Sequence, residues 1–253
     1  MRGGVALTTV QYRLLLEYDG TEYHGWQLQP NARTLQEVLE TALATVLRHP
    51  ARLHAAGRTD AGVHALGQVA TFQTERTIDV RDLRKALNAL TPSDVAVREV
   101  APAPESFDAR RSATSRVYEY RIWNQPWRSA FWHRYTWHVP RALDLRAMRA
   151  AAAVFVGKHD FSAFRAADCE SESRIRRVLH SGFTETENLC TYRIQANAFL
   201  KHMVRTIVGT LVVVGSGEVA PDDVARILAS RDRTQAGATA PPQGLCLVAV
   251  SYE

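Results

Sequence analysis

The glycine-rich segment GRTDAGVHALG at 57–67 brings Arg58, Asp60 and His64 close together in the chain. An ionised carboxylate can act as a nucleophile or as a base. Glycines let a ligand approach the backbone closely, and functional side chains concentrate on loops that a rigid scaffold positions. The same residues also suit an ordinary turn in which Asp60 hydrogen-bonds the local backbone, and on residue types alone this turn is the more common arrangement.

A metal site is not favoured at this segment. His54, Asp60 and His64 are separated by six and then four positions, and this spacing does not put all three on one helix. The three cysteines have no Cys-x-x-Cys spacing, so they indicate neither a zinc cluster nor a disulfide framework, and we expect buried free thiols. The sequence therefore predicts no metal.

A second stretch, ARRSATSRVYEYRIWNQPWR at 109–128, interleaves arginines with aromatic residues. Arginines contact phosphates and aromatic rings stack on bases, so the combination is typical of binding to single-stranded or looped RNA. The candidate contacts to the RNA backbone are Arg110, Arg111 and Arg116. An ordinary strand explains the pattern equally well, because Tyr118 and Tyr120 would share one face and could both be core.

A third segment, NAFLKHMVRTIVGT at 197–210, predicts a helix with a buried apolar stripe. His202, Arg205 and Gly209 fall on the opposite face. An arginine in an otherwise apolar helix is costly to bury alone, so it must reach water or meet a carboxylate. We expect Arg205 to meet Asp60, although the spacing does not show that they do.

Hydrophobic periodicity and turn residues predict the element order βαββαβ twice along the chain. In the first set the strands are at 12–18, 51–56, 68–73 and 95–100 and the helices at 35–47, capped by Thr34 with Glu37 at the capping-box position, and 80–90. In the second set the strands are at 116–123, 175–184, 190–196 and 245–252 and the helices at 144–156 and 200–214, with an extra helix at 221–229 that starts on Pro221.

This order predicts the α+β class, with two ferredoxin-like halves at 11–105 and 114–253. We expect the proline-containing segment 101–113 to be the linker and the two sheets to meet edge to edge near 102–115. A length of 253 residues agrees with two domains.

The charge balance favours a polyanionic partner. There are 31 Lys and Arg against 26 Asp and Glu, a net charge of +5, which suits nucleic acid without requiring it. The leading MRGGVALTTV has no signal-peptide character, and the longest apolar stretch, 207–214, is too short to span a bilayer. We expect a cytoplasmic protein that does not associate with membranes.

Five motifs occur in one order along the chain: YDGTEYHGWQLQP, GRTDAGVHALGQV, HDFSAFR, NAFLKHMVRTIVG and PPQGLCLVAVSY. Together they resemble the tRNA pseudouridine synthase A family, from about 12 to 252, and the leading ten residues lie outside the match and are expected to have no catalytic part. The resemblance implies that the two ferredoxin-like halves join into one mixed sheet with a central basic cleft. It also implies a homodimer, no metal or organic cofactor, and isomerisation of uridine to pseudouridine at positions 38, 39 and 40 in the anticodon stem-loop of tRNA.

The resemblance assigns roles to particular residues. Asp60 matches the catalytic aspartate, and the plain-turn interpretation of its segment is set aside. Arg58 matches the neighbour that helps to hold the flipped nucleotide, and Tyr118 the tyrosine that stacks on the uracil. Arg205 matches the arginine that pairs with the catalytic carboxylate, and Leu245 the aliphatic residue that lines the base pocket. The sequence leaves open whether Asp60 attacks the sugar C1′, attacks the uracil C6 or acts as a base.

Two alternatives remain. A non-catalytic RNA-binding protein with two RRM-like units would share the βαββαβ order, but it should carry an aromatic run on its third strand, where GQVATFQT has only Phe72. A hydrolase that uses Asp60 with His64 lacks a second positioned carboxylate or a nucleophile with its base.

Overall fold

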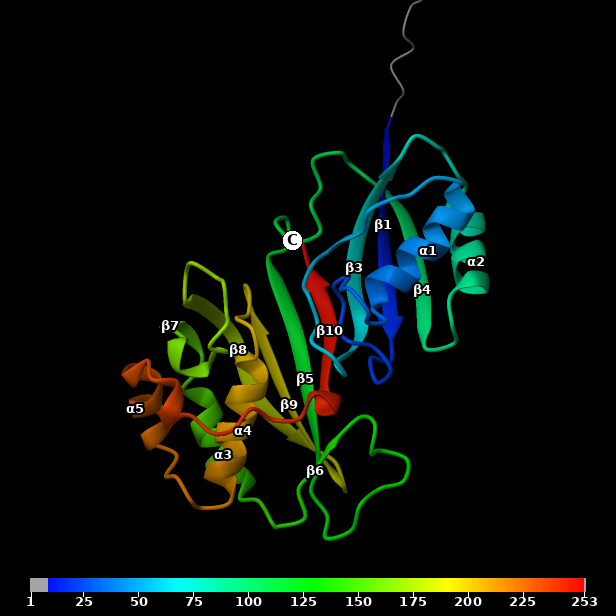
Figure 1. Ribbon diagram of the computed structural model, residues 1–253. Coiled ribbons are helices and arrows are strands. Elements are labelled where there is room, and N and C mark those ends of the chain that lie inside the picture. Colours follow the sequence, from blue (N-terminus) through cyan, green and yellow to red (C-terminus); the bar gives the residue numbers. More distant parts are fainter. Residues whose placement is uncertain (1–8, 253) are drawn as a thin grey trace, which may run out of the picture. The chain divides into compact units, whose positions relative to one another are not determined.

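The computed structural model describes residues 9–252, so most of the leading segment MRGGVALTTV lies outside the described residues. The chain divides into two compact units (Figure 1). The described residues up to Ala113, together with Tyr252, form the first unit, and Thr114–Ser251 form the second. Both units combine helices with strands, which confirms the α+β class. The joining of the two sheets and the basic cleft stay predictions.

The first unit has a small antiparallel sheet with two helices. In chain order its elements are β1 (Val10–Tyr18), α1 (Leu35–Leu47), β2 (His54–Ala55), β3 (His64–Thr74), α2 (Val80–Leu90) and β4 (Val95–Ala103). The strand order is β4-β1-β3, and the short β2 pairs with β3. In Figure 1, α1 and α2 lie on the same side of these strands.

Alternation along β1 creates the core of this unit. Tyr12, Leu14 and Leu16 are buried, as the period of two in a strand requires when one face is covered. The α1 helix also buries an apolar stripe, which includes Leu35 and Leu39. Its start is the predicted one, because the side chain of Thr34 accepts a hydrogen bond from the backbone N–H of Glu37.

The second unit has a larger sheet with three helices among its described residues. Its elements are β5 (Ser115–Trp123), β6 (Trp137–His138), α3 (Leu145–Ala153), β7 (Gly157–Asp160), β8 (Ile175–Glu185), β9 (Leu189–Ala196), α4 (Met203–Gly215), α5 (Asp223–Ser230) and β10 (Leu245–Ser251). The strand order is β10-β5-β9-β8-β7. The short β6 pairs with β5 in parallel whereas β9 and β10 pair with it antiparallel, so this sheet is mixed.

Several predicted boundaries are wrong for local reasons. The α4 helix begins at Met203 instead of 200, because His202 has a φ of +62° and interrupts the helical backbone. The α3 helix ends at Ala153 instead of 156. The α5 helix begins at Asp223, so Pro221 precedes its N-cap and is not its first residue.

The predicted linker is a packed part of the first unit. The β4 strand continues to Ala103. Beyond it, Nε2 of Gln11 donates to the carbonyl oxygens of Pro104 and Phe107, at 2.9 and 2.5 Å. The hydroxyl of Tyr252 donates to the carbonyl of Ala109, at 2.9 Å. These bonds fix the path of the chain as it leaves β4.

Two further sequence predictions concern the environment of the protein. Across residues 9–252, no helix has the length and apolar character needed to cross a membrane. Cys169, Cys190 and Cys246 are all buried and none forms a disulfide, as expected.

Candidate active site

Asp60 lies on the loop that connects β2 to β3. The loop closes in a turn in which the N–H of Val63 donates to the carbonyl of Asp60 at 3.2 Å, and Gly62 has a φ of +75°. Asp60 is half-buried and Arg58 is exposed, so both side chains of this segment reach solvent. The β3 strand begins at His64, earlier than predicted, which shortens the loop.

Buried hydrogen bonds fix the backbone on the N-terminal side of Asp60. The carbonyl of Thr59 accepts a hydrogen bond from the N–H of Trp26 at 3.0 Å. The hydroxyl of Thr59 lies 2.8 Å from the hydroxyl of Tyr18. Nε2 of the fully buried Gln68 donates to the carbonyl of Gly57 at 2.7 Å. Buried polar groups with partners of this kind define one conformation, because any other leaves them unpaired. The loop is therefore preorganised in the folded protein.

The segment YDGTEYHGW packs directly against the backbone of this loop. A Cβ on Gly20 would lie 2.0 Å from the carbonyl oxygen of Val63, and a Cβ on Gly25 would lie 2.7 Å from that of Thr59. Gly25 also has a φ of +88°. From the sequence, a role for this segment is indicated only by the family resemblance. No pattern within the segment shows that it supports the Asp60 loop.

Gly25→Ala should therefore lower both stability and activity more than a matched change at Gly217. Gly217 also has a positive φ, of +77°, but no atom lies within 4 Å of its added Cβ. Its substitution should cost only the backbone strain, about 1 kcal/mol, whereas Gly25→Ala adds the clash with Thr59. Thermal unfolding and catalytic rates of both variants measure the difference. Equal effects would show that the contact with the loop is unimportant.

His64 contributes to the same support. Its ring is buried, and both the N–H of Gly20 and Oδ1 of Asp19 lie 3.1 Å from its Nδ1. This nitrogen therefore has a partner in either tautomer, and the ring anchors the turn at Gly20. This explains a histidine here without a metal or a hydrolytic role. In the part of the chain that the structure describes, no three His, Cys, Asp or Glu side chains are grouped to hold a metal ion.

The second unit places Tyr118 and Leu245 on neighbouring strands. In the register of β5 and β10, Leu245 lies opposite Tyr120 and Leu247 lies opposite Tyr118. Tyr118 is 9% exposed, and its ring contacts that of Phe199 edge-on at 5.1 Å between centroids. Leu245 is also buried. An aromatic ring and an aliphatic side chain on adjacent strands can form one wall of an apolar pocket for a base.

Arg205 lies on α4, on a face that another segment covers. Its Nε donates to the carbonyl of Ala240 at 2.7 Å, and the N–H of Ala240 donates back to the Arg205 carbonyl at 3.1 Å. A Cβ on Gly209 would lie 1.7 Å from the carbonyl oxygen of Ala238. The absence of a side chain at Gly209 therefore lets two backbones touch on this face. The pairing of Arg205 with Asp60 stays a prediction.

Tyr120 gives a second indication of where Arg205 lies. Its hydroxyl donates to the carbonyl of Pro241 at 2.7 Å, and its ring fills the space where Gly244 would carry a side chain. Burial raises the pKa of the Tyr120 hydroxyl, and the positive charge of Arg205 opposes that rise. Arg205 is thus held close to β5 within the second unit.

The three arginines expected at the RNA backbone differ in exposure. Arg110 and Arg111 are exposed, and their backbone N–H groups donate to Oδ1 of Asp108 at 2.8 and 2.7 Å. These bonds, that of Arg111 above all, lower the pKa of the Asp108 carboxyl. Arg116 is only 8% exposed and donates to the carbonyl of Asn197 at 2.8 Å. The first pair is therefore better placed to meet a phosphate.

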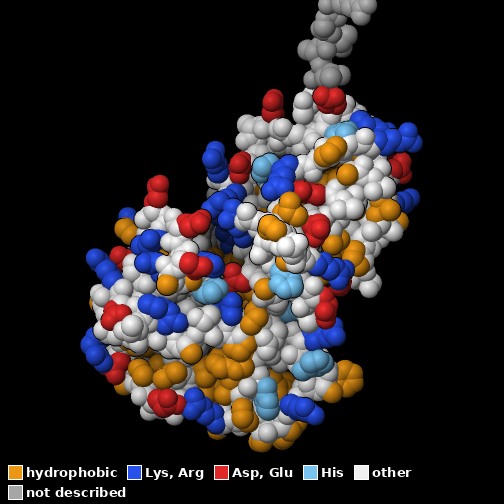
Figure 2. Space-filling model, in the orientation of Figure 1, with side chains coloured by type: hydrophobic (Ala, Val, Ile, Leu, Met, Phe, Trp, Pro, Cys, Tyr) orange, Lys and Arg blue, Asp and Glu red, His pale blue; other side chains and the backbone are white. Residues whose placement is uncertain are grey.

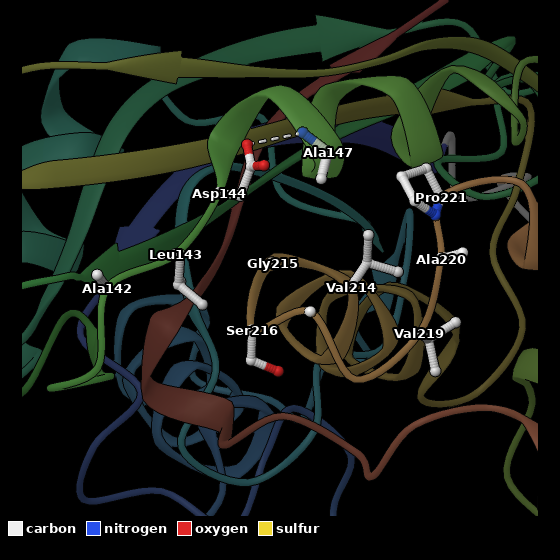
Figure 3. A pocket seen from close by; sticks show the side chains of 11 residues that line it. Ala142, Leu143, Asp144, Ala147, Val214, Gly215, Ser216, Val219, Ala220 and Pro221 are labelled. Atoms are coloured by element: carbon white, nitrogen blue, oxygen red, sulfur yellow. Dashed lines mark hydrogen bonds between the residues drawn. The ribbon is translucent and has the colours of Figure 1, made fainter.

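A pocket of about 620 Å³ in the second unit lies between the start of α3 and the end of α4 (Figure 3). Asp144 is the one charged side chain in its lining, and its carboxylate accepts from the N–H of Ala147, which caps α3. The other lining groups are mainly small and apolar. This pocket therefore offers no set of catalytic side chains.

These features define an α+β protein of two units that presents an aspartate on a preorganised loop, as an enzyme does. A model of the tRNA pseudouridine synthase family matches residues 15–110 and 151–253. A protein of Geotalea uraniireducens named tRNA pseudouridine synthase A is 48% identical over 242 residues, which cover 96% of this chain and 99% of that protein. The chain therefore belongs to the tRNA pseudouridine synthase family, which is a family of isomerases.

Two other relatives of the same name agree. The protein of Geobacter sulfurreducens is 48% identical and the match covers 95% of this chain and 98% of that protein. The protein of Thermoanaerobacter pseudethanolicus is 45% identical, with 94% and 98% covered.

Proposed function

We propose that the protein converts uridine to pseudouridine at positions 38, 39 and 40 in the anticodon stem-loop of tRNA, with Asp60 as the nucleophile. One observation supports this most: buried hydrogen bonds fix the backbone next to Asp60, while its carboxylate-bearing side chain stays partly exposed. A nucleophile needs both a fixed position and access to the substrate.

The reaction is balanced without an external oxidant or reductant. The N-glycosidic bond between C1′ and N1 breaks, the uracil turns, C1′ bonds to C5, the hydrogen of C5 leaves as a proton, and N1 takes up a proton. A carboxylate can take part by attacking C1′ or C6, and both routes require the same group in the same loop. Because no electrons are gained or lost, we expect neither a metal nor an organic cofactor.

The remaining site residues would bind and orient the base. A target base in a stem must leave its stack, which costs a few kcal/mol. In the proposal, Arg58 helps to hold the flipped nucleotide, Tyr118 stacks on the uracil and Leu245 lines its pocket. Tyr118 or water removes the proton from C5, and Arg205 pairs with Asp60.

The fold supports the same proposal in two ways. The strand orders β4-β1-β3-β2 in the first unit and β10-β5-β9-β8 in the second agree with the proposed ferredoxin-like βαββαβ halves, with β6 and β7 as additions. Phe72, on which an RRM-like alternative depends, is buried, and its ring stacks on that of Tyr12 with 5.5 Å between the ring centroids. It therefore cannot stack on RNA. We further propose, from family membership, a homodimer that acts in the cytoplasm.

Release of tritium tests this function. A tRNA transcript made with uridine tritiated at C5 should lose tritium to water when the protein is added, because the new C1′–C5 bond expels that hydrogen. A tRNA with cytidine at positions 38, 39 and 40 is the control and should release none. Release from both RNAs would contradict the proposed position, and release from neither would contradict the proposed reaction.

Arg110→Ala or Arg111→Ala should weaken binding of all tRNAs alike and reduce the dependence of log Kd on log salt by about one unit. Each guanidinium that meets a phosphate releases counterions, and both side chains are exposed next to the turn at Asp108. Titrations at several salt concentrations measure the slope. Arg81→Ala, an exposed change on α2, is the matched control. A loss limited to some tRNAs would instead indicate contact with bases.

A further inference from the structure

The loop between β5 and β6, residues 124–136, exposes large aromatic side chains. Phe131 is 90% exposed, Trp127 61% and Trp132 38%. In Figure 1 the loop is the green segment that extends beyond β5 and β6. By contrast Tyr118, Tyr120 and Trp123, which precede it in β5, are buried. In the aromatic and arginine-rich stretch of the sequence, the aromatic side chains of the strand are thus buried and those of the loop are exposed.

Hydrogen bonds within the second unit keep this loop in one conformation. The indole N–H of Trp123 donates to the carbonyl of Trp127 at 2.7 Å. Nδ1 of His133 donates to the carbonyl of Ala130 at 2.7 Å. The hydroxyl of Thr136 donates to the carbonyl of Trp132 at 2.8 Å. The exposed rings therefore cannot simply fold back into the core. Large exposed apolar side chains on a fixed loop indicate an interaction site.

The loop carries basic side chains and no carboxylate. Between Arg121 and Leu143 there is no Asp or Glu, while the loop itself contains Arg128, His133 and Arg134, all exposed. Where the loop lies in Figure 2, hydrophobic, histidine and basic side chains adjoin one another. The loop also falls outside both ranges, 15–110 and 151–253, that the family model matches.

We propose that the loop 124–136 is a stacking platform for unpaired nucleotides of the RNA, in addition to the site at Asp60. The proposal rests on the proposed function for its partner. Aromatic rings beside guanidinium groups bind bases through their π-faces and phosphates through charge. RNA is favoured over a second copy of the chain because the exposed Arg128 and Arg134 of the same loop complement phosphates.

The test compares tRNA affinity and turnover in single variants of the loop. Phe131→Ala and Trp127→Ala should each raise the Kd for unmodified tRNA about fivefold or more, as expected for the loss of one stacked base. KM should rise accordingly while kcat is unchanged. Phe131→Tyr should keep the affinity of the parent, because tyrosine can stack. Phe131→Leu should lose affinity as Phe131→Ala does, because leucine is apolar but cannot stack. Leu179→Ala on β8, also an exposed apolar residue, is the control.

The outcomes separate this proposal from the proposed function. If the parent protein binds tRNA and these Kd values do not change, the platform is wrong even where pseudouridine still forms. If Phe131→Leu binds as well as the parent, stacking is wrong. If sedimentation shows that Phe131→Ala dissociates an oligomer while RNA affinity per site is unchanged, the loop joins two copies and the proposal is overturned. Failure of the proposed reaction would appear as absent tritium release and would leave the binding comparison intact.

Discussion

Asp60→Asn should reduce pseudouridine formation at least about a thousandfold, the scale on which removal of a nucleophile acts, while tRNA affinity stays within about threefold of the parent. The substitution keeps the shape of the side chain and removes the negative charge that makes the carboxylate a nucleophile. Affinity should survive because contacts with phosphates dominate it. The fold should survive as well, since the buried hydrogen bonds of the loop belong to Gly57, Thr59 and Gln68.

Single-turnover rates with tritiated tRNA, together with a binding titration, measure both quantities. Asp82→Asn, an exposed aspartate on α2 of the same unit, is the matched control and should be fully active. A rate for Asp60→Asn within about tenfold of the parent corresponds to only about 1.4 kcal/mol of barrier. Such a result would exclude Asp60 as the nucleophile.

Arg205→Ala should lower turnover at least about a hundredfold and affinity far less. The bond from its Nε to the carbonyl of Ala240 fixes the guanidinium, so its charge acts at one place. Removing one partner of an ion pair that is buried away from water costs several kcal/mol. An exposed ion pair is usually worth less than about 1 kcal/mol. Arg205→Lys should recover only part of the rate, since lysine lacks the planar group that Ala240 orients.

The ratio of the effects on kcat and on affinity decides between two roles for Arg205. Arg226→Ala, an exposed arginine on α5, should change neither quantity. A loss of affinity with unchanged turnover would identify Arg205 as a phosphate contact. An experimental structure of the tRNA complex in which the guanidinium lies more than about 6 Å from the Asp60 carboxylate would equally contradict the pairing.

Helices whose limits depend on nearby residues could be predicted from the sequence. The α2 helix spans Val80–Leu90 as expected, because Asp79 caps its start and its apolar positions recur with the helical period. The start of β3 could not be predicted in this way. His64 belongs to the strand and is buried next to Gly20, which is 44 positions away in the chain. Contacts of that range leave no periodic signal.

The candidate site shows the same division. Asp60 and Arg58 became candidates because a glycine-rich loop concentrates unusual residue types at one point, and the family resemblance then favoured a functional role over a plain turn. The support of that loop by Gly20 and Gly25 could not be predicted, since the need for glycine there arises only when two backbones pack together. The contact of Gly209 with Ala238 is a second case. For the strand β5 the sequence left core and RNA contact open, and burial of Tyr120 and Trp123 favours core for those two side chains.

The central claim is that this chain makes pseudouridine in the anticodon stem-loop through Asp60. Mapping of carbodiimide-resistant adducts along an unmodified tRNA tests it directly, because pseudouridine retains the adduct under conditions that remove it from uridine. The account predicts adducts at positions 38, 39 and 40, wherever uridine occurs there, after incubation with the parent protein and none after incubation with Asp60→Asn. Adducts elsewhere in the tRNA, or the same adducts with Asp60→Asn, would contradict it.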